Sequence, residues 1–431
     1  FPPPDLADNL VELYFRHSNS IFPLLHRPTF NRQWQERLHH RNIWFTCVCL
    51  SIFAIASRWC HDQRVLPEKS TLADGNTGRR ITGQIHRVRR SLFHPASLFE
   101  VQTFTLMAMY LRGGATYPAA WLIVSTGIRK AQDVGAHRKR VYRGVPNIDD
   151  ELWKRAFWHL VVFDRLGGAY LGRACGLAEE DFDLDLPLEV DDDYWEATED
   201  GHGPFKQPSG VPSMVTAFNE FIKLTQIMAF AIRTLYTIDK SQVYRGIIPL
   251  ERGNLVKQLS LAMEEWKERI PKYLRWQDTM DVPVFSAQSA TLFSTFYLTR
   301  MLVHRPLIAP SPPNSPFEKG SEVAVSMSDP AILICSEAAS ACARIVEFQL
   351  QHGIHDFNVP NIIGVSHASA ALLLLSAWKL KVQERDLRRK DVADIKPPLA
   401  QRIEQKVADI KIFLHALEEL RPRWEAVDTL L

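Results

Sequence analysis

Two short runs in this sequence place potentially catalytic or metal-binding side chains next to one another. Residues 60–62 read Cys-His-Asp, the residue types of a catalytic triad, but triad partners meet in space from distant positions in the chain. Residues 191–193 are three aspartates, which could hold a cation only if the loop wrapped around it, since successive side chains cannot all point at one ion. We expect no catalysis at the first run and a solvated loop at the second.

Sequence motifs of known catalytic and metal-binding classes are missing. The chain has no Gly-x-Ser-x-Gly, phosphate loop, Gly-x-Gly-x-x-Gly or His-Glu-x-x-His. Its close cysteine pairs, Cys47 with Cys49 and Cys335 with Cys342, come without the second pair that a zinc site needs. We therefore expect this chain to be no enzyme and to contain no metal site or cofactor.

Charged residues in the apolar segment 152–173 must be paired if they are buried. We expect an ion network that locks helices together, in which arginines pair with Asp164 or Asp181. Its members are Arg155, Asp164, Arg165, Arg173 and Asp181. The alternative is that these charged groups hold a ligand.

Aromatic residues around the same segment could line a small-molecule site, because pockets in helical proteins form between helices. The candidate ligand-binding residues are Trp121, Arg155, Trp158, His159, Arg173 and Tyr297. Further walls could come from Phe157, Phe163, Tyr170, Phe293, Phe296 and His304. The competing hypothesis is that the aromatic rings simply fill the core.

The elements that position these residues are predicted to be helices. Apolar residues recur at helical spacing in 6–14, 153–161, 255–270 and 403–417, with Asp149 or Asp150 as a cap for the second, and alternating strand patterns are scarce. With 431 residues, 46% of them hydrophobic and 23% charged, the chain is typical of soluble globular proteins and long enough to bury a core without disulfides. We predict an all-α fold, a large multi-helix domain with long loops.

Pro- and Gly-rich stretches and charge runs divide the chain. We expect one domain over residues 1–308, a disordered Pro/Ser-rich loop over 309–330, and C-terminal helices over 331–431 packed on the same unit. Residues 174–200, here called the acidic strip, contain twelve acidic residues and no Lys or Arg, and could contact one of two basic clusters, at 79–90 or at 138–143. The net charge of +2 argues against a broadly basic nucleic-acid surface. The apolar runs 47–56 and 362–378 are too short or too interrupted to cross a membrane.

Three stretches, at 14–30, 120–138 and 154–195, resemble the fungal-specific transcription factor domain, the helical middle homology region of binuclear zinc-cluster regulators. The family's opening looks like YF…P.LH.PTF, its central helix like AW…G.AIRLAQDLGLHR, and its signature like FW.L…DR..S..LGRP followed by LP...DDE.W. Residues 297–308 are similar to a later family segment that ends in His-Arg-Pro. The chain departs from the pattern at Gly167-Gly168 and at Ala174-Cys175, where the family usually has a small residue and a proline.

The resemblance implies a regulatory domain that controls RNA polymerase II transcription in the nucleus without contacting DNA. DNA would be bound through a missing N-terminal cluster with two zinc ions, because the chain, which opens without Met, resembles only the middle of such proteins. Expected partners are the transcriptional machinery or repressor proteins, with a small-molecule effector and a second copy of the chain as further candidates, and no membrane. The alternative is a helical protein-interaction scaffold that does not activate transcription.

Overall fold

A computed structural model describes residues 1–66, 78–85, 94–114, 117–196, 204–236, 252–280, 282–308, 330–389 and 398–431. Within these ranges the chain is helical and contains no β-strand, which confirms the predicted all-α class. Apart from Pro330, the loop expected at 309–330 lies outside the described residues.

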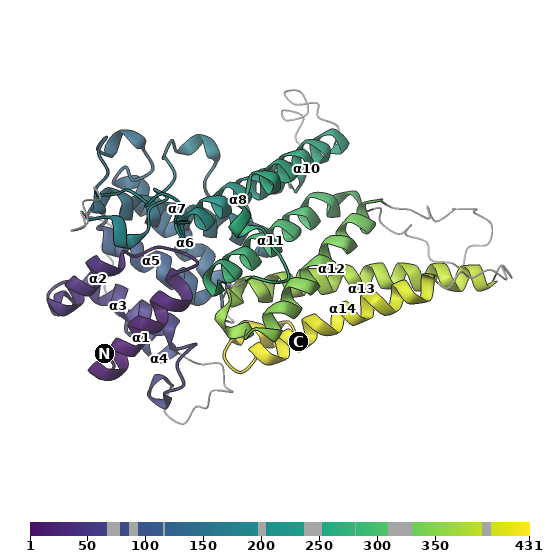
Figure 1. Ribbon diagram of the computed structural model, residues 1–431, viewed down its shortest axis with the longest axis horizontal. Coiled ribbons are helices and arrows are strands. Elements are labelled where there is room, and N and C mark those ends of the chain that lie inside the picture. The colour runs from purple at the N-terminus through teal and green to yellow at the C-terminus, as the bar shows by residue number, and fades with distance from the viewer. Residues whose placement is uncertain are drawn as a thin grey trace.

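Helices in the N-terminal half form the broad end of the molecule (Figure 1). In chain order they are α1 (Pro4–Tyr14), α2 (Arg27–Gln35), α3 (Ile43–Ala56), α4 (Arg79–Ile85), α5 (Leu98–Leu111), α6 (Tyr117–Asp133), α7 (Ile148–Leu171) and α8 (Val215–Leu235). Helix α3 packs against α1, α4 and α5, and α7 packs against α5, α6 and α8. The sequence of α3 is apolar on every side, and none of its last eleven positions carries a polar group beyond a small hydroxyl or thiol. Its burial from Phe45 to Ala56, where only Thr46 is half-buried, follows from this composition.

Helix α7 is the central helix of this half. Its N-terminal cap is Asn147, whose Oδ1 accepts a hydrogen bond from the Asp150 backbone N–H at 2.9 Å. The expected cap, Asp149 or Asp150, is therefore wrong by two or three residues, because both aspartates already lie in the first turn. The helix ends at Gly172, which adopts the left-handed conformation with φ of 64°. Between these ends it carries Arg155, Asp164 and Arg165 into the core.

Helices in the C-terminal half continue from the same core. They are α10 (Arg252–Arg269), α11 (Pro283–His304), α12 (Pro330–Gln351), α13 (Val359–Arg389) and α14 (Pro398–Leu420). Helix α11 packs against α8, α10, α12 and α13, and α13 and α14 run side by side to the narrow end of the molecule (Figure 1). A polar bridge ties the halves together: Asn361 of α13 accepts hydrogen bonds from the Tyr170 hydroxyl of α7 and the Thr295 hydroxyl of α11, both at 3.2 Å.

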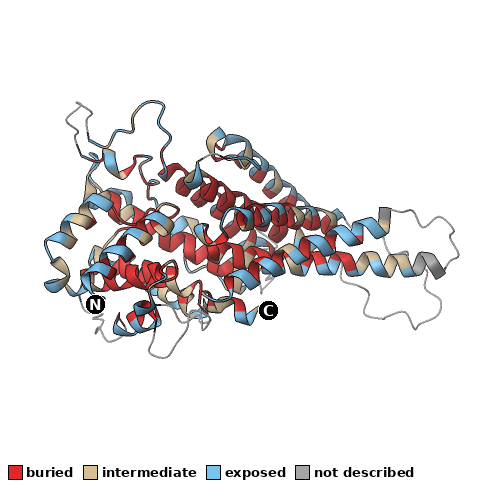
Figure 2. Ribbon diagram, turned by 60° about the horizontal axis from the view of Figure 1, so that its bottom comes forward, coloured by how far each residue is buried: buried red, intermediate tan, exposed pale blue. Residues whose placement is uncertain are grey.

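Buried residues occupy the facing sides of the helices, whereas the narrow end is mostly exposed or half-buried (Figure 2). Among the described residues one segment, Val359–Arg385, is long and apolar enough to cross a membrane by length and composition, contrary to the sequence-based expectation. Of its most apolar window 56% is buried inside the protein, and core helices pass the same test.

The apolar stripe predicted in α14 is only partly buried. Ile403, Ile410 and Leu417 are buried, whereas Val407 and Leu414 are exposed. The buried face instead includes Lys406 and Asp409, which contact serines of α12. Apolar periodicity could not identify this face, because two of its members are charged.

Candidate functional site

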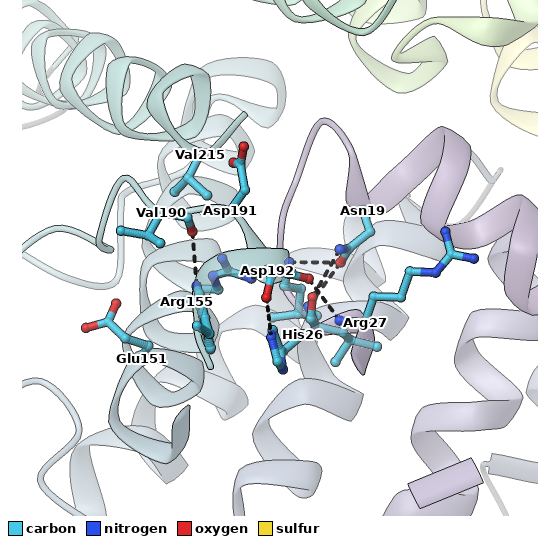
Figure 3. A network of polar contacts seen from close by, with 12 residues as sticks. Asn19, His26, Arg27, Glu151, Arg155, Val190, Asp191, Asp192 and Val215 are labelled. Carbon is cyan, nitrogen blue, oxygen red and sulfur yellow. Dashed lines mark hydrogen bonds and ion pairs between the residues drawn. The ribbon is translucent and has the colours of Figure 1, made fainter. Parts of the chain in front are cut away.

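Polar residues of the family-like stretches connect helices, and Asp192, which was expected in a solvated loop, is at the centre of these contacts (Figure 3). Its carboxylate accepts a hydrogen bond from Arg155 Nη1 of α7 at 2.9 Å and one from the Arg27 backbone N–H at the start of α2, also at 2.9 Å. Its carbonyl oxygen lies 3.0 Å from His26 Nε2. One residue thus joins α7, the first turn of α2 and the acidic strip of residues 174–200, to which Asp192 itself belongs.

Trp195 supplies the apolar side of this contact. Its indole is buried, its Nε1–H donates to the Val190 carbonyl at 3.0 Å, and the His26 ring stacks on it at 4.4 Å. The Arg155 guanidinium also lies against this indole, 4.4 Å from the ring centroid. We call His26, Arg155, Asp192 and Trp195 the clasp.

The hydrogen bonds of His26 fix its tautomer. A carbonyl oxygen can only accept, so the Nε2 that faces the Asp192 carbonyl carries the proton. Nδ1 is then the acceptor for the Thr29 backbone N–H and hydroxyl, which makes the side chain the N-terminal cap of α2. Burial lowers the pKa of His26, which favours this neutral form.

The other carboxylates of the acidic strip are also used structurally. Asp191 accepts hydrogen bonds from the Ser213 hydroxyl at 2.9 Å and from the Met214 backbone N–H at 2.8 Å, just before α8 begins. Glu189 accepts from Thr216 and Asn219 of α8. The expectation of a solvated loop at 191–193 is therefore wrong for Asp191 and Asp192, and holds only for Asp193, which is exposed.

The acidic strip also contacts the basic cluster at 138–143, as the charge pattern suggested. The Lys139 ammonium lies 2.8 Å from Asp185 Oδ1, and its backbone N–H donates to Asp183 Oδ1 at 2.8 Å. Both side chains of the Lys139–Asp185 pair are more than half exposed, so this ion pair contributes little to stability.

The acidic partners in the buried ion network differ from those expected. Arg155 pairs with Asp192, and Arg165 pairs with Glu179 while donating to the Ile222 carbonyl at 3.1 Å. Asp164 accepts from the backbone N–H groups of Gly176 and Leu177 at 2.8 and 3.3 Å. Both N–H groups donate to Oδ2, and Oδ1 is buried without a hydrogen-bond partner among the described residues. The sequence order of charges did not reveal that the partners of Asp164 would be backbone groups.

Two further members of the expected network, Arg173 and Asp181, contact groups outside that network. The Arg173 guanidinium lies 4.8 Å from the Trp121 ring centroid, and Asp181 accepts from the Ala178 backbone N–H at 2.8 Å. The two departures from the family pattern lie against each other here, since a Cβ on Gly168 would be 3.0 Å from Cys175 Sγ. The cysteine thus occupies space that a larger residue at 168 would need.

The candidate ligand-binding residues make core contacts. Trp158 packs edge-on against Phe182 and donates from Nε1 to the Asp185 carbonyl at 2.9 Å. His159 is fully buried and stacks on Phe218, and burial lowers its pKa to about 3, so it is neutral. Tyr297 packs edge-on against Phe296.

Two hollows between helices lie elsewhere. One of about 40 Å³ is lined by the segment 17–22 that follows α1, by residues at the ends of α3, α5 and α13, and by Trp424. One of about 300 Å³ lies between α12 and α14. Neither is lined by any of the six candidate ligand-binding residues. Effector binding at those six residues stays a prediction.

The residues present do not fit the two zinc ions that the family resemblance implies. Within the described ranges no three His, Cys, Asp or Glu side chains come together as metal ligands. Five of the six cysteines are buried, and burial raises the pKa of Cys175 and of Cys342 to about 12, so these thiols stay protonated. Zinc binds thiolate, so these cysteines suit packing rather than a zinc cluster.

Sequence reasoning missed His26, Asp192 and Trp195 as site residues. The aspartate was assigned to a solvated run and the other two were quoted only as parts of the family motifs. A signal was present in the sequence. The stretches around His26 and around Asp192 and Trp195 each place a polar residue beside an aromatic or apolar one next to a helix end, and this combination suits a buried polar contact.

Comparison with known proteins gives the family. The Fungal specific transcription factor domain matches residues 11–268. The chain is 26% identical to Cutinase transcription factor 1 alpha of Fusarium vanettenii, over 81% of this chain and 36% of that protein. It is 25% identical to Transcriptional activator protein acu-15 of Neurospora crassa, over 80% and 35%. It is 24% identical to Activator of stress genes 1 of Saccharomyces cerevisiae, over 71% and 32%.

The chain spans about a third of the length of these relatives. No solved structure matches it significantly. The first and third of the stretches that carry the resemblance, 14–30 and 154–195, supply the clasp and the contacts of Asp164, and the family match covers all three stretches. Because this match extends over more than half of the chain, the protein belongs to the fungal-specific transcription factor domain family.

Proposed function

We propose that this chain is the regulatory domain of a fungal transcription factor, that it acts in the nucleus, and that it works by binding rather than by catalysis. The observation that carries the proposal is the use made of the motif residues. The side chains of His26, Arg155, Asp192 and Trp195 contact one another and the backbone of adjoining segments, which suits a scaffold that must hold its helices in a fixed arrangement. The relatives' printed names, all of which describe transcriptional regulators, support the same role.

DNA contact belongs to another part of the full protein in this proposal, through a zinc cluster that the cysteines described above do not provide. A net charge of +2 on 431 residues gives little release of counterions from a DNA duplex. The regulatory input is a partner protein, either a repressor or part of the transcriptional machinery, or a small-molecule effector.

A reporter assay tests the role. The whole chain is fused to a heterologous DNA-binding module, and output is measured in yeast from a promoter that also has a basal activator site, so that activation and repression are both visible. We expect the fusion to change output relative to the module alone. Asp192→Ala, which opens the clasp, should shift that output, whereas the exposed neighbour substitution Asp193→Ala should not.

An output equal to that of the module alone, from a fusion shown to be folded and nuclear, contradicts the proposal. That result would favour the interaction scaffold. Specific binding of the purified chain to DNA duplexes at ~150 mM salt would contradict the assignment of DNA contact to another part of the protein.

A further inference from the structure

A polar groove lies between α12 and α14, away from the clasp and from the family motifs. Its volume is about 300 Å³, and it opens to solvent. The lining residues are Leu333, Ser336, Glu337, Ser340, Arg344, Arg402 and Lys406. Six of these seven carry a polar or charged group, in contrast to the mainly apolar and aromatic lining of the smaller hollow beside Trp424.

Helical spacing explains how the groove is built. Ser336, Ser340 and Arg344 follow one another at intervals of four along α12, and Arg402 and Lys406 are four apart on α14. Residues at this spacing lie on one face of a helix. Two packed helices therefore present two serine hydroxyls and three cationic groups to the same space.

The charge in the groove is predominantly positive. Three cations line it against one carboxylate, Glu337. Adding the buried Asp409, which accepts a hydrogen bond from the lining residue Ser340, leaves these five groups with a net charge of +1. Asp409 is held by neutral donors, the Ser340 hydroxyl at 2.5 Å and Gln405 Nε2 at 3.0 Å. Among the described residues, no carboxylate forms an ion pair with Arg344 or Arg402.

Lys406 is the most informative of these groups. Only 8% of the residue is exposed, and its ammonium contacts the Ser336 hydroxyl, a neutral acceptor. An ammonium has three N–H donors, and burying it is costly unless acceptors satisfy them. Burial and the neighbouring Arg402 lower the pKa of Lys406, while Asp409 and Glu337 oppose that shift. The site is thus built around a cation that lacks a close counter-ion.

We propose that this groove binds a small anion that carries phosphate or carboxylate groups, with Lys406 at its base and Arg402 and Arg344 at its mouth. Guanidinium groups suit these planar or tetrahedral oxyanions because they donate two parallel hydrogen bonds. The Ser336 hydroxyl, whose oxygen accepts from Lys406, can donate its proton to a remaining oxygen. A volume of about 300 Å³ is at the small end of ligand pockets and fits a sugar phosphate or a tricarboxylate. The inference does not depend on the proposed regulatory function.

The test uses the whole chain and isothermal titration calorimetry with three probes: inorganic phosphate, citrate and fructose 1,6-bisphosphate. Potassium chloride keeps the ionic strength constant in every titration, because surface charge pairs weaken with salt. We expect saturable binding at one site with a dissociation constant below ~1 mM for citrate or the bisphosphate. Which of the two binds more tightly distinguishes a carboxylate ligand from a phosphate ligand.

The variants distinguish binding in the groove from non-specific attraction of an anion to surface charges. Lys406→Met keeps the apolar stem and removes the charge, and Arg402→Gln removes a charge at the exposed rim. Each should weaken binding about tenfold or more. Lys411→Gln, an exposed position on the same helix outside the groove, is the control and should leave binding within about twofold of the original.

The proposal would be overturned by the absence of saturable binding to all three probes, by an equal loss of affinity in Lys411→Gln, or by unchanged binding in Arg402→Gln combined with Arg344→Gln. The last variant carries the test if Lys406→Met fails to fold, because both arginines are exposed. Displacement of the bound probe by duplex DNA at equal phosphate concentration would indicate a nucleic-acid surface and would also overturn it.

Discussion

The imidazole ring of His26 lies almost parallel to the indole ring of Trp195, with the ring centroids 4.4 Å apart and the planes inclined by 10°. His26 is also bonded to the Asp192 carbonyl, across 166 positions of sequence. The two family motifs that contain these residues are thus parts of one contact. Its integrity decides whether α2, α7 and the acidic strip hold a fixed arrangement.

The clasp predicts different consequences for two adjacent aspartates. Asp192→Ala should lower the free energy of unfolding by about 3–5 kcal/mol, because it leaves the fully buried Arg155 without its counter-charge. Asp193→Ala, at an exposed position, should change it by no more than about 0.5 kcal/mol. Urea denaturation of both variants measures the difference. Equal midpoints would show that the pair with Arg155 does not stabilise the fold.

Helix positions were predictable because apolar residues at helical spacing signal a buried face in most of the chain. The buried residues of α1, α7 and α10 follow the predicted stripes. Apolar periodicity predicted the wrong buried face in α14, where Val407 and Leu414 are 38% and 43% exposed and Lys406 is buried. A periodicity argument assigns charges to solvent, so it cannot find a buried face that contains them.

The candidate site was predictable only in part, for a related reason. The sequence indicated that Arg155 must be paired, since its neighbours are apolar, and it is. The partner could not be identified, because Asp192 is 37 positions away in a run of like charges that is typical of solvated loops. Which member of such a run turns inward depends on tertiary contacts such as the stacking of Trp195.

Asp164 predicts a difference between two substitutions. Asp164→Ala removes the acceptor for the Gly176 and Leu177 backbone N–H groups. It should destabilise the protein by about 1–3 kcal/mol, the cost of one buried unsatisfied donor, because Leu177 is buried whereas Gly176 is exposed. Asp164→Asn keeps an acceptor oxygen in place and should cost less than about 1 kcal/mol. Calorimetric melting of the two variants compares them. An asparagine variant as unstable as the alanine variant would mean that the negative charge itself is needed.

The same carboxyl predicts the sign of a pH effect. Burial raises the pKa of Asp164 above its ordinary value of 3.8, so the folded state binds this proton at a higher pH than the unfolded state does. Its ionisation therefore opposes folding at neutral pH, and the opposition declines as pH falls through the folded-state pKa. Relative to Asp164→Asn, the original protein should gain stability on acidification in that range. A gain of the same size in both proteins would assign the effect to another group.

His159 predicts the opposite pH effect. Burial lowers its pKa from 6.5 to about 3, so below pH 6.5 the unfolded state binds a proton that the folded state does not. The free energy of unfolding should then fall by about 1.4 kcal/mol per pH unit between pH 6.5 and 3 from this group alone. His159→Phe keeps a ring against Phe218 and removes the titration. Urea denaturation from pH 7 to 5 measures the free energy of unfolding of the original protein and of His159→Phe. Below pH 6.5 the difference between the two values should change with pH at this rate. A difference independent of pH would show that the imidazole is solvated.

The last prediction concerns the junction of the two halves. Gly364 of α13 faces Tyr170 of α7, and a Cβ at position 364 would lie 2.4 Å from the tyrosine ring. This ring cannot easily move aside, because its hydroxyl donates to Asn361 Oδ1, so Gly364→Ala should destabilise the protein by about 1–3 kcal/mol through overpacking. Gly253→Ala in α10, where nothing lies within 4 Å of the added carbon, should be neutral or stabilising by up to about 1 kcal/mol. If α12, α13 and α14 belong to the same folding unit as α7, Gly364→Ala will shift a single thermal transition of the whole chain. Two transitions, with only one of them moved by the substitution, would show instead that the C-terminal helices unfold separately from the N-terminal half.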